Sequence, residues 1–172
     1  MIYLMKEQNH IISTIVEHKP GVLYTVANLF RRRGFNIESI SVGPTEQSDM
    51  ARMTITVKGD ERTVEQVVKQ LNKLIDVIKV SRLDSASIVT RELALIKVRA
   101  LDTKVRSDVI NYADIFRARV VDVSPESLMV EITGTSDKID AFLDLMKPFG
   151  VKEAARTGIT ALSRGVKSVK IE

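Results

Sequence analysis

The sequence predicts an α+β protein made of two consecutive βαββαβ modules. Three observations lead to this fold class: strand-like segments recur along the chain, amphipathic segments with helical spacing separate them, and the same order of elements occurs twice. A short polar connection at residues 84–88 marks the expected boundary. We therefore expect one domain at residues 1–84, with its strand core starting near residue 10, and a second domain at residues 88–172.

The first module begins with a strand at residues 10–17, which is rich in β-branched residues and ends at a Pro20-Gly21 turn. A helix is predicted next, over Val22–Arg33, because apolar residues recur at i, i+3, i+4 and i+7. The predicted core face consists of Leu23, Val26, Ala27 and Phe30. Gly34 follows three arginines and is well placed to end the helix in the left-handed conformation.

Three strands and one helix complete this module. Residues 35–42 and 49–58 alternate apolar and polar side chains, which predicts an antiparallel pair. Helical spacing then runs over residues 64–75, and residues 77–84 form a closing strand. This order is ferredoxin-like, with two helices on one face of a four-stranded sheet. The other face of the sheet must be covered by something.

The second half repeats the same order. Strands are expected at residues 92–100, 118–123, 128–133 and 151–156, with Thr103 and Ser136 as caps of the two helices. The first of these helices carries an apolar stripe of Val105, Val109, Tyr112 and Phe116. The chain is thus predicted to hold two tandem ferredoxin-like modules, followed by a partly ordered basic arm at residues 157–172.

Composition excludes several classes of function. The 172 residues are 44% hydrophobic and 28% charged with a net charge of +4, a normal globular balance, and no cysteine is present for disulfides or thiolate metal sites. Neither a basic leader nor a long apolar span occurs, so we expect a cytoplasmic protein without a membrane segment. Arg31, Arg32 and Arg33 could suggest RNA, but residues 49–58 lack the aromatics that single-strand binders use. We therefore expect no nucleic-acid partner.

The turn before the first helix is the best candidate for a ligand site. Gly21 lacks a Cβ, and the unpaired N–H groups and positive dipole end of the helix favour a carboxylate. Asn36 offers a carboxamide that donates and accepts hydrogen bonds. Turn chemistry alone also accounts for Gly21, and Asn36 also suits a left-handed position after Gly34. Neither histidine, His10 or His18, has metal-ligand spacing, and no carboxylate pair indicates acid–base catalysis.

Several motifs together resemble one known family. They are Pro20-Gly21-Val22-Leu23, then Arg33-Gly34-Phe35-Asn36-Ile37-Glu38-Ser39, and in the second half Glu92-Leu93-Ala94-Leu95-Ile96-Lys97-Val98 and Gly134-Thr135-Ser136-Asp137-Lys138. Nearly the whole chain resembles the small regulatory subunits of acetohydroxyacid synthase, also called acetolactate synthase, and the first module resembles an ACT domain.

The resemblance implies a subunit without catalytic residues or cofactors of its own. It implies a catalytic large subunit as partner, which carries thiamine diphosphate, FAD and Mg²⁺, and a homodimer formed through the ACT domains. The implied task in branched-chain amino acid biosynthesis is activation of that partner and feedback inhibition by valine, leucine or isoleucine, most often valine. At the position of His18 the family often has Asn. The resemblance implies that the effector lies against His18, Gly21 and Asn36, and Leu23, Ile37 or Ile40 could flank its aliphatic side chain. The candidate effector-binding residues are therefore His18, Gly21, Val22, Leu23, Asn36 and Ile37.

Two alternatives remain open at this point. The chain could be a stand-alone ACT regulator that senses an amino acid and acts on another enzyme or a transcription complex. It could also be a small enzyme on a ferredoxin-like fold, which the lack of a nucleophile–base pair disfavours.

Overall fold

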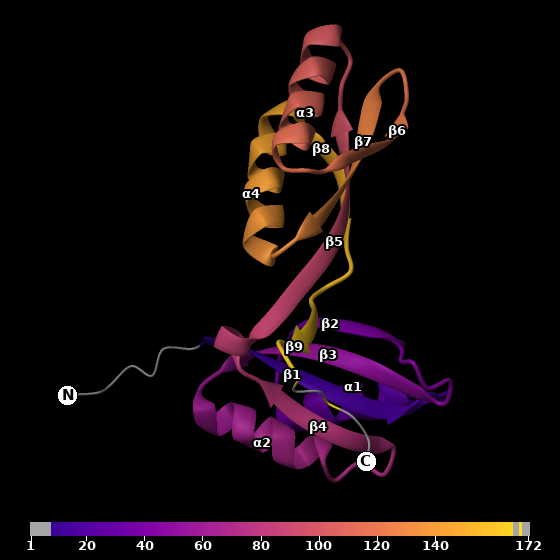
Figure 1. The fold of residues 1–172 in the computed structure, drawn as a ribbon, viewed down its shortest axis with the longest axis vertical. Helices are drawn as coiled ribbons and strands as arrows, with labels where there is room; N and C mark the ends of the chain where they lie inside the picture. The colour runs from indigo at the N-terminus through magenta and orange to yellow at the C-terminus, as the bar shows by residue number, and fades with distance from the viewer. Residues whose placement is uncertain (1–7, 167–168, 170–172) are drawn as a thin grey trace, which may run out of the picture. The chain divides into compact units, whose positions relative to one another are not determined.

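The computed structural model describes residues 8–166 and Val169. The chain forms two compact units, one built from the chain up to Val89 together with the chain from Ile159 onward, the other from Thr90–Gly158 (Figure 1). Each unit is an α+β module, so the predicted fold class is confirmed. The described residues after Ile159 group with the first unit rather than with the second, where the sequence-based boundary had put them.

The first unit is a four-stranded antiparallel sheet with two helices. Its strand order is β2-β3-β1-β4, so β2 and β4 are edge strands. The predicted antiparallel pairing of the second and third strands is confirmed. The elements are β1 Gln8–Glu17, α1 Val22–Arg33, β2 Ile37–Pro44, β3 Met50–Gly59, α2 Glu61–Leu71 and β4 Val77–Leu83.

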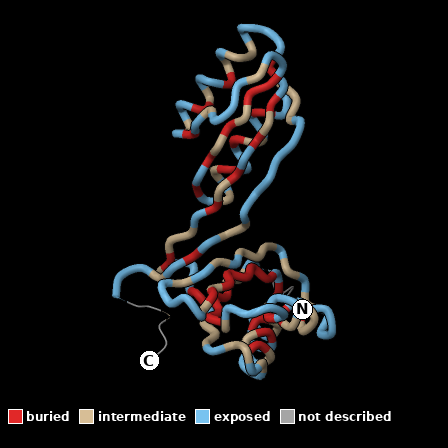
Figure 2. Tube along the Cα trace, turned by 90° about the vertical axis from the view of Figure 1, so that its right-hand side faces the viewer, coloured by how far each residue is buried: buried red, intermediate tan, exposed pale blue. Residues whose placement is uncertain are grey.

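Both helices pack on the same face of this sheet. Their buried residues form one core cluster with alternate residues of β1 and of β3, such as the paired Ile12 and Ile55. Figure 2 shows the buried residues on the inside of the unit and the exposed ones on its outer turns. Gly34 ends α1 with φ +68°, as predicted.

Two details of the helices differ from the sequence-based expectation. The sheet-facing side of α1 is Val22, Val26 and Phe30, whereas Leu23 and Ala27 are exposed. The apolar pattern is broader than the face that the sheet covers. The predicted face is therefore rotated about the helix axis relative to the observed one. Helix α2 ends at Leu71 instead of continuing to Ile75, which is exposed, and the Asn72 side chain bonds back to the Val68 carbonyl.

The helix-free face of the same sheet is covered by residues 159–166 and Val169. This segment contains a short strand, β9 Thr160–Ser163, that the sequence did not reveal and that pairs with β5, Ile88–Arg99 (Figure 1). Ala161 is buried in a cluster with Leu83 and Ile88. The expected basic arm is therefore in part a structural element of the first unit, and residues 167–168 and 170–172 lie outside the described part of the chain.

The second unit repeats the arrangement with the strand order β6-β7-β5-β8. Its core contains Ile96 of β5, Val130 of β7, Val109 of α3 and Phe142 of α4. The short turns η1 Ser85–Ser87 and η2 Lys147–Phe149 precede β5 and β8. The remaining elements are α3 Thr103–Ile115, β6 Arg119–Val123, β7 Ser127–Gly134, α4 Ser136–Met146 and β8 Val151–Arg156.

The caps of α3 and α4 lie one residue earlier than expected. Asp102, rather than Thr103, accepts the hydrogen bond of the Val105 N–H at 2.8 Å. Thr135, rather than Ser136, is the N-cap of α4, and the Ser136 hydroxyl donates instead to Glu92. A carboxylate accepts more strongly than a hydroxyl, which explains the choice of Asp102.

Candidate functional site

The loop between β1 and α1 is held in place by its backbone. The His18 N–H donates to the Asp49 carbonyl at 2.7 Å, and the Glu17 N–H donates to the Asp76 carbonyl at 3.0 Å. Lys19 forms ion pairs with Asp76 and Glu17. Hydrogen bonds to the carboxylates of Asp76 and then Glu17 raise the pKa of the Lys19 ammonium above its usual value. The His18 side chain itself is exposed.

Gly21 occupies the N-cap position of α1 with φ +90°, a conformation that residues with a Cβ rarely adopt. No side chain caps the helix here, and a Cβ built on Gly21 would meet nothing within 4 Å. The Gly21 carbonyl accepts from the Thr25 N–H and hydroxyl. The first N–H groups of α1 thus have no side-chain cap, an arrangement that favours an anion such as a carboxylate.

Asn36 lies at the opposite end of the sheet. Its side chain donates to Glu38 at 2.5 Å, and it directly precedes β2, where Ile37 pairs with Val57 of β3. His18, in contrast, bonds to Asp49 just before β3 begins. Asp49 and Val57 are eight residues apart, which at about 3.3 Å per residue is roughly 26 Å. One chain therefore does not bring Asn36 to Gly21.

The remaining predicted site residues, Val22, Leu23 and Ile37, differ in how far they are exposed. Val22 is 4% exposed and packs in the core, so only its backbone N–H is oriented to serve a ligand at the turn. Leu23 is 49% exposed beside Gly21, and Ile37 is half-buried beside Asn36. The predicted site residues thus lie at two ends of the first unit: His18, Gly21, Val22 and Leu23 at one end, Asn36 and Ile37 at the other.

An exposed apolar strip lies between these two ends. At about 100° per residue, Leu23 and Ala27 lie on the flank of α1 opposite Asn28 and Arg32, which line a groove shared with α2. Because α1 leads into the edge strand β2, the flank that faces away from α2 lies toward that edge. Within the described residues, β2 pairs on one side only, with β3. Strip and strand edge together form a surface suited to a second chain.

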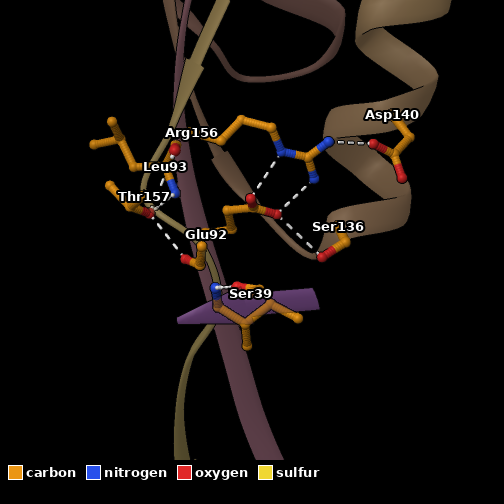
Figure 3. Close-up of polar contacts among 9 residues, drawn as sticks. Ser39, Glu92, Leu93, Ser136, Asp140, Arg156 and Thr157 are labelled. Carbon is orange, nitrogen blue, oxygen red and sulfur yellow. Dashed lines mark hydrogen bonds and ion pairs between the residues drawn. The ribbon is translucent and has the colours of Figure 1, made fainter. Parts of the chain in front are cut away.

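A polar cluster in the second unit escaped the sequence-based search. Glu92 is 5% exposed and accepts two hydrogen bonds from Arg156, at 2.6 and 2.7 Å, and one from Ser136 (Figure 3). Arg156 also donates to Asp140 on α4. The Arg156 guanidinium, followed by burial and the Ser136 hydrogen bond, sets the pKa of Glu92, and the net effect is a pKa below its usual value. A fully bonded carboxylate is a poor proton acceptor, so this cluster joins β5, β8 and α4 structurally.

The described residues form neither a metal-binding cluster nor a membrane-spanning helix. Among residues 8–166 and Val169, no three His, Cys, Asp or Glu side chains are grouped so that they could hold a metal ion. In the same part of the chain, every helix is too short or too polar to cross a membrane.

Comparison with known proteins matches each of the two units to a family profile. A family profile described as "AHAS small subunit-like ACT domain" matches residues 12–79, and a profile described as "Small subunit of acetolactate synthase" matches residues 91–165. A protein of Methanothermobacter thermautotrophicus named "Probable acetolactate synthase small subunit" is 59% identical over 165 residues, 96% of this chain and 98% of the relative. The chain belongs to the acetolactate synthase small-subunit family.

Other members of the acetolactate synthase small-subunit family show the same likeness. The "Acetolactate synthase small subunit" of Mycobacterium bovis is 53% identical over 96% of this chain and 98% of its own length. The crystal structure of the acetolactate synthase small subunit from Thermotoga maritima has a TM-score of 0.86 and 46% identity, covering 92% of this chain and 98% of that one. The predicted family is confirmed, and with its ACT domain it supports a regulatory role.

Proposed function

We propose that this chain is the regulatory subunit of an acetolactate synthase, which binds the catalytic large subunit, raises its activity and makes it sensitive to a branched-chain amino acid, with valine as the expected effector by family precedent. In this proposal the large subunit carries thiamine diphosphate, FAD and Mg²⁺, and the small subunit contributes no catalytic residue. The single observation that carries the effector part is the separation, by the length of a strand, of the two groups of predicted site residues, which we call half-sites.

A two-fold pair of chains would bring the half-sites together. Antiparallel pairing of β2 with β2 of a second copy sets Ile37 of one chain opposite the Pro44 end of the other. That end of β2 pairs with the start of β3, which lies beside the His18–Gly21 loop. Asn36 of one copy then approaches Gly21 of the other, and the Leu23–Ala27 strips of the two α1 helices become covered.

The paired site matches the chemistry of an aliphatic amino acid. The N–H groups of α1 and the glycine backbone suit the carboxylate, while the Asn36 carboxamide oxygen suits the ammonium group. Leu23 and Ile37 supply apolar surface for a branched side chain. Since one member of each pair comes from each chain, two equivalent sites arise per dimer.

The test is a calorimetric titration of valine, leucine and isoleucine into the purified chain, followed by synthase assays with the reconstituted large subunit. We expect one of the three to bind with one site per chain and to lower the rate of the complex. Activation without any effect of the three amino acids would remove the effector part of the proposal. Failure to co-purify with a thiamine-diphosphate enzyme would instead favour a stand-alone ACT regulator.

A further inference from the structure

The segment that covers the helix-free face of the first sheet contacts both edge strands of that sheet, β2 and β4. We call residues 159–166 with Val169 the tail segment. Its backbone is held at β2 by two serines: the Ile159 N–H donates to Ser39 Oγ at 3.1 Å (Figure 3), and Ser41 Oγ donates to the Ile159 carbonyl at 2.9 Å. Both polar groups of one peptide residue are thus bound to the same edge strand.

The tail segment then crosses to the opposite side of the sheet. Ala161 is 1% exposed in a cluster with Leu83 of β4 and Ile88, and half-buried Ile11 and Ile159 pack against it. Beyond β9, the Arg164 N–H donates to the Ser87 carbonyl at 2.8 Å, and its side chain donates to the Ile88 carbonyl at 3.1 Å.

The face beneath the tail segment is unusually polar for a buried surface. Ser13 is 0% exposed and Thr54 is 2% exposed, although both point away from the helices. Arg52 donates to Ser13 Oγ at 3.1 Å and to the Val169 carbonyl at 3.4 Å. Hydrogen bonds to hydroxyls and carbonyls are directional and are readily exchanged for water, so such a contact can be released at a lower cost than an apolar one.

Two of the residues that hold or form the tail segment, Ile88 and Ile159, lie where the chain leaves and re-enters the first unit. Ile88 leads directly to residues 90–158, and Ile159 directly follows them. Ser39 and Ser41, the anchors at β2, are two and four residues beyond Ile37, which belongs to the proposed effector half-site. A shift of β2 would therefore displace the tail segment, which is bonded next to both peptide connections between the first unit and residues 90–158.

We propose that the tail segment couples effector binding at β2 to the second module: it docks on the sheet in one arrangement of β2 and is loosened in the other. This rests on the proposed function, because it needs an effector that binds the two arrangements with different affinity. The coupling works in both directions, so a loosened tail segment also changes the response of the complex to valine.

The test uses the full chain with the double substitution Ser39→Ala and Ser41→Ala, reconstituted with the large subunit. Calorimetry should still show valine binding with one site per chain, because neither serine belongs to the half-sites, and by reciprocity its Kd should rise by no more than the factor by which inhibition weakens. The valine concentration for half inhibition of the synthase should rise by about fivefold or more, since fivefold is the lower end of usual allosteric coupling. Activation without valine should stay within about twofold.

A second variant and a structural measurement keep the test decisive. Ala161→Asp places a charge in the Leu83–Ile88 cluster and should reproduce the loss of inhibition, and hydrogen exchange at the Ile159 and Arg164 amides should quicken in both variants. Ser48→Ala, in the exposed turn between β2 and β3, serves as the matched control and should behave as the parent.

The two ways of failing are distinct. Quickened exchange at Ile159 and Arg164 with unchanged valine inhibition would overturn the coupling role and leave the proposed function intact. Unchanged exchange in both variants would overturn the anchoring contacts on which the coupling depends. A parent chain that neither binds valine nor transmits it to the synthase would overturn the effector part of the proposed function, and the coupling with it.

Discussion

At the level of single residues, Gly21 combines two properties that a substitution separates. Its φ of +90° makes any side chain unfavourable, yet the space in front of it is open. The cost of a substitution is therefore conformational, whereas the effect on a ligand depends on the charge introduced. A charged and an uncharged replacement at the same position distinguish the two.

For Gly21→Asp we expect loss of valine inhibition with retained activation of the large subunit, because the new carboxylate repels the carboxylate of the effector. Gly21→Ala has the same backbone strain without the charge and should keep a weakened response. Gly150→Asp, at φ +94° in the second unit, controls for strain elsewhere and should stay fully sensitive. The readout is the valine concentration for half inhibition, and full sensitivity of Gly21→Asp would contradict the site.

Glu92 illustrates a residue whose ionisation supports the fold. Its pKa is lowered in the folded state, mainly by Arg156, so it stabilises the protein at pH values above its unfolded pKa of about 4.3. That contribution is lost as the pH falls through the lower, folded pKa. The sign is the opposite of that for a histidine or lysine stabilised by a new partner.

We expect Glu92→Gln to lower the free energy of unfolding at pH 7 by about 2 kcal/mol, less than the roughly 3–5 kcal/mol of a fully buried pair, because Arg156 keeps Asp140 and contact with water. Urea unfolding from pH 3 to pH 7 should also show a weaker pH dependence below about pH 4.5. Asp140→Asn, at an exposed carboxylate, should cost less. Equal stability of the parent and Glu92→Gln at pH 7 would contradict this role.

At the level of elements, α1 has two apolar sides, one covered by the sheet and one exposed. Val22, Val26 and Phe30 face the sheet, whereas Leu23 and Ala27 face the edge at β2. A helix that buries only the first set leaves the second set to water. Pairing of two chains through β2 would cover it and would satisfy the free edge of the strand.

We expect Ala27→Glu to weaken the dimer by about tenfold or more, since a charge would be buried against the same charge of the second copy. Sedimentation velocity should show a larger monomer fraction, and valine affinity should fall together with the dimer fraction because each site needs both chains. Gln66→Glu adds the same charge on an exposed position of α2 and should change neither. A dimer of unaltered strength would show that the chains pair elsewhere.

At the level of the whole molecule, the second unit is inserted into the first. Leu93 and Thr157 lie near its two ends and share backbone and side-chain hydrogen bonds, so the ends of residues 90–158 are held close together. The first unit, in contrast, needs the chain after Ile159 to cover its helix-free face. The two units should therefore differ in their tolerance of truncation.

We expect a fragment of residues 90–158 to unfold cooperatively on its own, as seen by circular dichroism during heating. A chain ending at Gly158 should instead lose about 2–4 kcal/mol of stability in its first unit, from the exposure of Ile88 and Leu83 and the loss of several hydrogen bonds. A chain ending at Val166 keeps Ala161 and Arg164 and should retain most of that stability. An unfolded 90–158 fragment would contradict the division into these two units.

The sequence alone determined the order of elements, the two-module architecture and the family, because strand alternation, helical spacing and the motifs around Gly21 and Asn36 are local properties. It also located the left-handed end of α1 at Gly34. It did not determine which side of α1 the sheet covers, since Val22 and Leu23 are equally apolar neighbours and only packing distinguishes them.

Tertiary structure decided the rest. Only the strand register shows that Gly21 and Asn36, fifteen residues apart in sequence, lie at opposite ends of one sheet. Only the return of the chain shows what covers the helix-free face, where Ser41 and Ile159 are separated by 118 residues. Contacts between distant segments depend on the folding of everything between them, and no local pattern in residues 159–166 indicates which surface they cover.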